Sequence, residues 1–154
     1  MFIKVSLFVL SSKDGSKVLN NISIEEALQK GIEAHKAGKA QEADRYYTAI
    51  LKADPKHPDA NHNMGVLAVG VGKVEEALPF FKTGLEVNPN VAQYWISYID
   101  ALVRLDRIED AQGVINWAKE AGVSEELLRK LASKLNSGNN QTLSKEIMKS
   151  LLED

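Results

Sequence analysis

Small and bulky apolar residues recur along this chain at a fixed interval of 34 positions. Gly31 and Gly65 are one such pair, and Pro55 and Pro89 are another. The remaining columns are Gly38 and Gly72; Ala43, Ala77 and Ala111; and Tyr47, Phe81 and Ile115. Within each interval the apolar residues return every three or four positions, which indicates amphipathic helices. A constant period with two such segments predicts an all-α solenoid, in which helical hairpins stack in chain order.

Six helices follow from the local signals that punctuate this pattern. Ser23 opens a capping box, and Gly38 and Gly72 suit the left-handed residue that follows a helix end. Asp106 takes that place in the third repeat, because Asp adopts left-handed angles more easily than most residues. We expect Pro79, which falls inside the fourth helix, on its solvent side. The predicted helices are 24–37, 40–53, 58–71, 74–87, 92–105 and 108–121.

The end of the repeat region is predicted from a change in composition. Ser124 begins a polar-faced helix over 124–135, which would cap the last hydrophobic edge of a solenoid. The run NSGNNQ at 136–141 is typical of a flexible linker, and a short amphipathic helix follows at 142–153. The predicted division is an N-terminal apolar segment and linker at 1–22, a repeat domain at 23–135 with repeats at about 24–57, 58–91 and 92–123, and a C-terminal part at 136–154.

The N-terminal residues 1–10 are apolar apart from Lys4 and Ser6. The run is too short to span a bilayer, which needs about 20 residues, and it lacks the basic start and cleavage site of a signal peptide. Its composition suits a short strand that ends at the turn signal of Asp14 and Gly15. Three hypotheses stay open: a tail that covers the first helix, a strand that docks on its own chain or forms a homodimer, and a membrane contact.

Charge and composition narrow the class of partner. The chain has 154 residues, a formal net charge of −2, a pI near 6.0 and no cysteine. This charge provides no basic field for nucleic acid and no attraction to anionic membranes. The lack of cysteine excludes a disulfide framework and any Cys-based metal site or nucleophile. We expect one cytoplasmic domain that is large enough to bury a core.

Two short motifs resemble chemical sites and are rejected. The Gly-Lys pair at 72–73 follows an apolar run, but Val74 stands where a phosphate-binding loop needs Ser or Thr. His57, Asp59 and His62 lack a further ligand nearby in sequence, so we interpret the histidines as surface residues at a helix start. No GxSxG or HExxH motif occurs. The sequence therefore predicts no catalytic residue, no metal and no cofactor, and a protein that is not an enzyme.

The repeated pattern resembles the tetratricopeptide repeat (TPR) family, whose consensus runs Trp-x2-Leu-Gly-x2-Tyr, then Ala-x3-Phe, then Pro. The second repeat matches it at Gly65, Ala77, Phe81 and Pro89. The first repeat matches at Gly31, Ala43, Tyr47 and Pro55, and the third keeps Trp95 and Ala111 but has Ile99 for the glycine and Ile115 for the aromatic. The resemblance covers about 24–123 and the capping helix. It implies a right-handed α-solenoid of three TPR hairpins and a C-terminal capping helix.

In TPR proteins the first helix of each repeat lines a concave groove that takes an extended peptide or a helix of another protein. The resemblance therefore implies a protein or peptide ligand and a groove on the first helices here. Helical phase carried through the repeats predicts the groove residues Gln29, Ile32, Lys36, Asn63, Val66, Gly70, Ser97, Asp100 and Arg104. Gln29, Asn63 and Ser97 form one column that could hydrogen-bond a peptide backbone, or they are simply solvated.

Chaperone-adaptor TPR domains hold a C-terminal carboxylate with lysine, arginine and asparagine. The corresponding positions of this chain are Leu28, Ile32, Asn63, Gln93 and Ser97. Asn63 alone matches, so an acidic chaperone tail is not the expected ligand. Ile32, Val66 and Val103 indicate a partly apolar groove instead. One hypothesis places residues 2–10 in it, from the same chain or from a neighbour.

The function predicted from these features is a non-catalytic protein-protein interaction scaffold. Two alternatives stay open. The repeats also resemble those that precede transferase domains in bacterial TPR-glycosyltransferase and methyltransferase chains, which would make this chain the partner-positioning module of a larger enzyme. A third interpretation is a self-assembling scaffold held together by its terminal segments.

Overall fold

The structure is a computed structural model that describes the backbone of residues 22–152 and the side chains of residues 22–138. Residues 1–21 and 153–154 lie outside the described part of the chain. The predictions made for the apolar N-terminal segment therefore concern residues that the structure does not describe.

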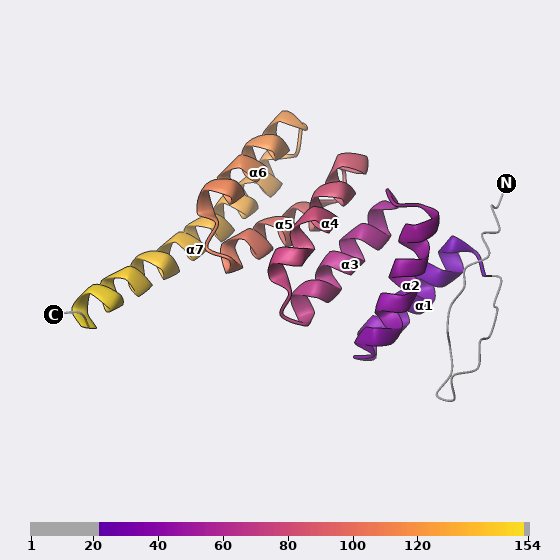
Figure 1. The fold of residues 1–154 in the computed structure, drawn as a ribbon. Coiled ribbons are helices and arrows are strands. Elements are labelled where there is room, and N and C mark those ends of the chain that lie inside the picture. The colour runs from indigo at the N-terminus through magenta and orange to yellow at the C-terminus, as the bar shows by residue number, and fades with distance from the viewer. Residues whose placement is uncertain (1–21, 153–154) are drawn as a thin grey trace. The chain divides into compact units, whose positions relative to one another are not determined.

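Residues 22–152 form helices joined by short turns, and no strand occurs among them (Figure 1). The helices are α1 (Ile24–Lys36), α2 (Ala40–Ala53), α3 (Pro58–Gly70), α4 (Val74–Val87), α5 (Ala92–Arg104), α6 (Ile108–Glu120) and α7 (Glu125–Leu152). The first six start at the predicted residues and end at the predicted residue or one position earlier. The predicted all-α fold of helical hairpins is confirmed.

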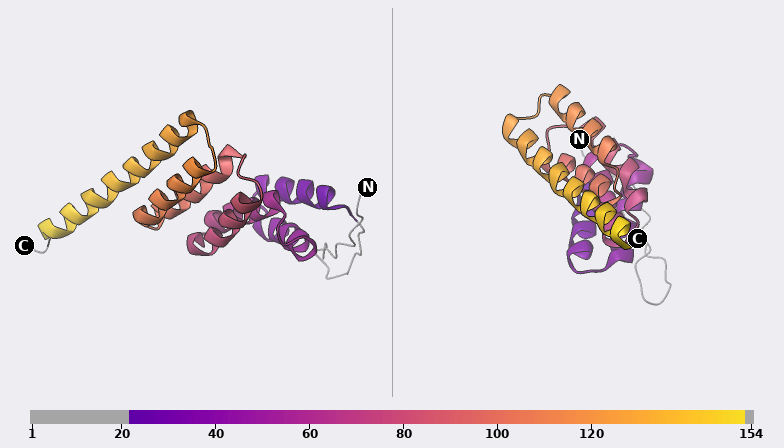
Figure 2. Two further views of the ribbon diagram at one scale, coloured as in Figure 1. Left: turned by 90° about the horizontal axis from the view of Figure 1, so that it is seen from above. Right: turned by 90° about the vertical axis from the view of Figure 1, so that its left-hand side faces the viewer.

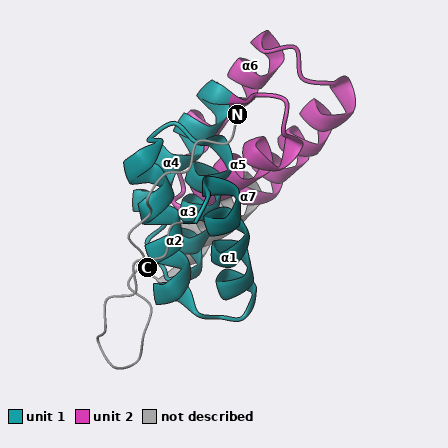
Figure 3. Cartoon of the chain, turned by 90° about the vertical axis from the view of Figure 1, so that its right-hand side faces the viewer, with its two compact units in different colours: residues 1–87 teal, residues 88–154 magenta. Residues whose placement is uncertain are grey.

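The helices group into two compact units (Figure 3). Unit 1 spans residues 1–87 and holds the hairpins α1–α2 and α3–α4, whereas unit 2 spans residues 88–154 and holds α5, α6 and α7. Each unit is described by itself below.

The turns inside the hairpins use the residues that the sequence indicated. Gly38 and Gly72 have φ angles of +73° and +84°, which L side chains rarely adopt. Asp106 takes the same role at φ +59° and is the non-glycine residue with positive φ in the described part of the chain. The prediction that Asp106 adopts the left-handed conformation of the turn glycine is confirmed.

Side chains satisfy backbone amides at three helix starts, one of them that of α7, where the Ser124 hydroxyl accepts from the Leu127 amide at 3.3 Å. The Ser23 hydroxyl accepts a hydrogen bond from the Glu26 amide at 3.1 Å, as a capping box requires. His57 precedes α3 and accepts from the Ala60 amide through Nδ1 at 3.2 Å, while Pro58 fills the first helical position. Serine capping was predicted from the sequence; histidine capping was not.

Unit 1 packs each of its hairpins on a glycine. A Cβ built on Gly31 would lie 2.6 Å from Cε1 of Tyr47, and one built on Gly65 would lie 2.5 Å from Cε1 of Phe81. Both rings are almost fully buried. The missing side chain therefore lets the aromatic ring of the second helix lie against the backbone of the first.

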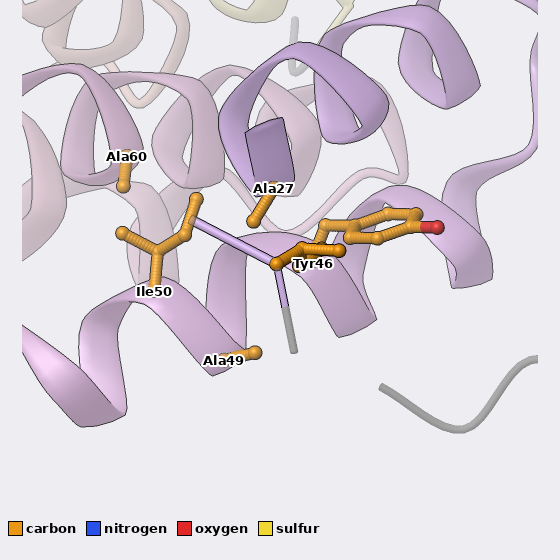
Figure 4. Close-up of a cluster of buried hydrophobic side chains, with 6 residues drawn as sticks. Ala27, Tyr46, Ala49, Ile50 and Ala60 are labelled. Atoms are coloured by element: carbon orange, nitrogen blue, oxygen red, sulfur yellow. The ribbon is translucent and has the colours of Figure 1, made fainter. Parts of the chain in front are cut away.

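Small residues also bring α1, α2 and α3 together. Ala27, Tyr46, Ala49, Ile50 and Ala60 lie in one buried cluster (Figure 4), to which Ile22 also belongs. Alanine at these positions allows the helix backbones to come close enough for Ile50 to fill the remaining space. The cluster joins the first hairpin to the second.

Pro79 lies inside α4 and its side chain is exposed, as predicted. A proline in a helix interior removes one backbone hydrogen bond. One turn later, the Thr83 hydroxyl donates to the Pro79 carbonyl at 2.9 Å. The exposed side of α4 accommodates this defect because solvent can satisfy the remaining backbone groups.

Unit 2 builds its core differently. Ile99 stands where the other repeats have glycine, and it is fully buried together with Trp95 and Leu131. The rings of Trp95 and Trp117 meet edge to face, with centroids 4.9 Å apart and planes at 74°. Large side chains thus replace the glycine–aromatic packing of unit 1.

The predicted end of the repeat region is wrong. The sequence predicted a helix ending near Leu135, a flexible linker at 136–141 and a separate short helix, but α7 continues without a break from Glu125 to Leu152 (Figures 1 and 2). Gly138 is buried, and a Cβ there would collide with Val103 of α5. Ser137 donates to the Ser133 carbonyl at 3.0 Å within the helix. Packing against α5 outweighs the weak individual helix propensities of Asn, Ser and Gly.

Candidate functional site

The groove residues predicted on α1 form a stripe that lies beside the buried side of the helix. Ala27, Gly31 and Ala34 are buried against the rest of unit 1. Gln29 and Lys36 are exposed and Ile32 between them is half-buried. These three residues are spaced by three and four positions, so they share one face of α1. The stripe is therefore accessible and has an apolar centre.

The matching stripe of α3 has a similar character. Asn63 and Val66 are half-buried, and Gly70 is exposed with open space among the described residues where a side chain would stand. α1 and α3 are in contact within unit 1. Together the two stripes place Ile32 and Val66 in one column, with Gln29 and Asn63 in the next. We call this set of five residues, which includes Lys36, the α1/α3 face.

The polar groups of the α1/α3 face are only lightly engaged. The Gln29 amide donates to Glu33 Oε1 at 3.0 Å along the helix surface. Asn63 Oδ1 lies 3.4 Å from Nδ1 of His62, which is long for a hydrogen bond. Both amide groups can therefore exchange these contacts for a peptide backbone.

The prediction that the histidines at the start of α3 lie on the surface is wrong for His62. Its side chain is buried, and its ring lies 5.7 Å from that of Phe81. Burial lowers the pKa of His62, while the hydrogen bond to Asn63 and the charge of Asp59 oppose the shift. Among the described residues, no group of three or more His, Cys, Asp and Glu side chains could hold a metal ion. His62 is therefore a core residue that packs beside Phe81 and contacts Asn63.

The third predicted stripe, on α5 of unit 2, is charged. Asp100 accepts from Nε of Arg104 at 3.3 Å and from Nζ of Lys134 at 3.1 Å. Gln93 donates to the Ser97 hydroxyl at 3.3 Å. The carboxylate of Asp100 is thus held by two cations, one of them on α7.

Sequence reasoning missed the α7 residues that meet this stripe. Lys134 lies 34 positions after Asp100, and Gly138 lies 34 after Arg104. The period therefore extends into α7, whose first half takes the place of the first helix of a further repeat. This spacing was the available signal, but the low-complexity run around Gly138 hid it.

One backbone anchor recurs in both units. Asn61 of α3 donates through Nδ2 to the Pro55 carbonyl at 3.0 Å, and Trp95 of α5 donates through Nε1 to the Pro89 carbonyl at 2.8 Å. The two donors are 34 positions apart, and so are the two prolines. Different side chains therefore tie the proline turn to the helix that follows it.

Comparison with known proteins agrees with this geometry. The model of the tetratricopeptide repeat family matches residues 34–97. This part of the chain, 64 of the 154 residues, is therefore similar to tetratricopeptide repeats. No curated protein matches its sequence significantly.

Solved TPR structures share the fold at low sequence identity. A tetratricopeptide repeat protein from Parabacteroides merdae has a TM-score of 0.67 and 21% identity, over 79% of this chain and 48% of that chain. The TPR2B domain of yeast Sti1, in a complex with pHsp70, has a TM-score of 0.62 and 20% identity, over 74% of this chain and 96% of that chain. The first TPR of Spaghetti (RPAP3), bound to the HSP90 peptide SRMEEVD, has a TM-score of 0.60 and 21% identity, over 79% and 95%.

None of the helices in the part of the chain that the structure describes is long and apolar enough to cross a bilayer.

Proposed function

We propose that this protein is a non-catalytic adaptor that binds an extended, partly apolar protein segment on the α1/α3 face of unit 1. The observation that carries the proposal is the column of Ile32 and Val66, two half-buried apolar side chains on adjacent helices, beside the amides of Gln29 and Asn63. An extended peptide offers alternate side chains and backbone groups at a matching spacing.

The composition of the face favours an apolar ligand over an acidic tail. Leu28 and Ile32 stand where chaperone adaptors carry charged side chains, and Leu28 packs against the core of unit 1. Lys36 is the cation of the α1/α3 face. The Sti1 and RPAP3 structures support peptide binding as a use of this fold. The RPAP3 peptide SRMEEVD is acidic, however, whereas Lys36 is the single cation among the five residues of the α1/α3 face.

Unit 1 is a better candidate than unit 2 for the main contact. On α5, a ligand that paired with Asp100 would have to displace Lys134 or Arg104. Ser97 accepts a hydrogen bond from Gln93, and Arg104 is exposed but pairs with Asp100. The α1/α3 face needs no such exchange of ion pairs.

The test is a selection of linear peptides from a displayed random library against the full chain, followed by fluorescence anisotropy of the selected peptides. Ile32→Glu or Val66→Glu should weaken binding by about tenfold or more, because the carboxylate would be buried in an apolar contact. Val87→Glu is the matched control, since Val87 is exposed at the end of α4 and outside the face.

Two outcomes would contradict the proposal. Selected peptides that bind the Ile32 and Val66 variants as tightly as the parent chain would place the site elsewhere. Peptides that are rich in Asp and Glu and release steeply with added salt would indicate an acidic ligand instead, because screening weakens exposed charge pairs but not apolar contacts.

A further inference from the structure

Unit 1 carries a hollow of about 700 Å³ bounded by α2, α3 and α4. Its lining includes Met64, Leu67, Ala68, Val71 and Phe80, which are all apolar. None of these residues belongs to the α1/α3 face. The hollow is therefore a second surface, separate from the one assigned to the partner segment.

Val71 makes this hollow unusual for a repeat that otherwise buries its large apolar side chains. It is 53% exposed, and Val87 at 44% is the other large apolar side chain with comparable exposure in the described part of the chain. Val71 borders the hollow, whereas Val87 does not. A concave surface with an exposed apolar rim favours an apolar occupant.

The other residues that line the hollow are mostly polar, and they include both acidic and basic side chains. Lys73 and Glu76 pair with each other at 3.5 Å. Asp44 and Arg45 stand on the α2 side, and Asp44 is exposed. An occupant with an apolar body and a single cation would match the apolar lining and could place that cation beside Asp44.

We propose that the occupant is residues 2–10 of the same chain. Seven of these nine residues are apolar, and Lys4 is the single charge among them. Removing apolar side chains from water is favourable, so burial in the hollow would stabilise a segment of this composition. This assignment differs from the hypothesis that the segment fills the binding groove, because the hollow lies on α2, α3 and α4.

The connecting chain is long enough for this docking. Ile22, the first described residue, is anchored in the cluster of α1, α2 and α3. Residues 11–21 can span about 36 Å when extended. α1 has 13 residues, so the hollow at the far end of unit 1 is about 20 Å further along. Residues 11–21 are also mostly polar, as a connection over the surface requires.

The experiment uses the full chain, which has no cysteine to interfere with labelling. Ser6→Cys carries a nitroxide, and paramagnetic broadening of backbone amide signals is measured by NMR. We expect broadening at Thr48, Ala68 and Val71, which line the hollow, and none at Val87 at the opposite end of α4.

Variants on both sides of the contact sharpen the result. Val71→Glu should reduce the docked population by about tenfold, because docking would bury a carboxylate, and should restore the signals of Thr48 and Ala68. Phe8→Asp should do the same from the segment side, and it leaves every residue that lines the hollow unchanged. Val87→Glu should leave the broadening unchanged. None of these changes should affect peptide binding by the α1/α3 face, so the two proposals can fail independently.

Three results would overturn the proposal. The first is the absence of broadening around the hollow. The second is broadening that Val71→Glu and Phe8→Asp leave unchanged. The third is broadening that appears in a mixture of nitroxide-labelled and isotope-labelled chains, because it would then come from the segment of a second copy.

Discussion

The two units share the 34-residue period but pack the helices of their hairpins differently. In unit 1 a glycine on the first helix of each hairpin faces an aromatic ring on the second, as in Gly65 and Phe81. In unit 2 the same two positions hold Ile99 and Ile115, which are both buried. A pair of medium side chains thus replaces a small and a large one. Because two isoleucines occupy more volume than a glycine and an aromatic ring, α5 and α6 pack less closely than the helices of the unit 1 hairpins.

The largest effect on stability is expected where the close glycine–aromatic contact of unit 1 is disturbed. Gly65→Ala puts a Cβ 2.5 Å from the Phe81 ring, so we expect the free energy of unfolding to fall by about 2 kcal/mol. Urea denaturation followed by circular dichroism measures it. Adding Phe81→Leu should recover part of the loss, because the pair then approaches the arrangement of unit 2.

Gly113→Ala is the matched control, because Gly113 lies inside α6 with open space around it among the described residues. It should raise stability by about 0.5–1 kcal/mol through helix propensity alone. If Gly65→Ala also stabilised the protein, the glycine–aromatic contact would not define unit 1.

Unit 2 has one glycine contact of its own, and it tests the role of α7. Gly138→Ala should collide with Val103 and lower stability by about 1–2 kcal/mol. Val103→Ala in the same chain should relieve the collision, and denaturation of the single and double variants measures the coupling. Independent effects of the two changes would mean that α7 does not depend on close approach to α5.

The two glycine–aromatic pairs of unit 1 differ by one hydroxyl. Within the described part of the chain, the fully buried Tyr47 hydroxyl has no hydrogen-bond partner. Tyr47→Phe makes the first hairpin resemble the second and should raise stability by about 1 kcal/mol. A loss of stability would mean that the hydroxyl has a favourable contact after all.

Tyr47→Phe should also change how the stability of the protein depends on pH in the alkaline range. Burial raises the pKa of Tyr47 from 10.0 to about 12. Between these values the unfolded chain loses the proton first, so stability should fall as the pH rises from 10 toward 12. Tyr47→Phe should remove this contribution, as denaturation at several alkaline pH values can show.

The smallest expected effect is a pH dependence confined to unit 1. Burial lowers the pKa of His62 below its usual 6.5, so the unfolded chain takes up the proton first as the pH falls. The contribution to stability is complete above pH 6.5 and declines below it. Ile96 occupies the same repeat position in unit 2 and does not titrate.

His62→Leu should flatten the dependence of the unfolding free energy between pH 7 and pH 5, as measured by urea denaturation. A slope that survives in the His62 variant would assign the pH dependence to carboxylates.

Local signals explain why the first six helices could be predicted to within one residue. Ser23 caps α1, Gly72 ends the first helix of its hairpin, and Asp106 replaces a turn glycine. Each acts over three or four neighbouring residues, and the 34-residue period repeats the information. The candidate stripes on α1 and α3 followed from helical phase for the same reason, and their role in binding is still a prediction.

Contacts between helices decided the rest. The burial of His62 depends on Phe81, which lies 19 positions away in the sequence. Gly138 of α7 packs against Val103 of α5, and Lys134 of α7 pairs with the carboxylate of Asp100. Composition predicted a linker at residues 136–141. That prediction failed because helix propensity is a weak term compared with the packing between helices. The sequence alone therefore determined the hairpins and their turns, while tertiary packing decided which polar residues are buried and kept Gly138 inside the last helix.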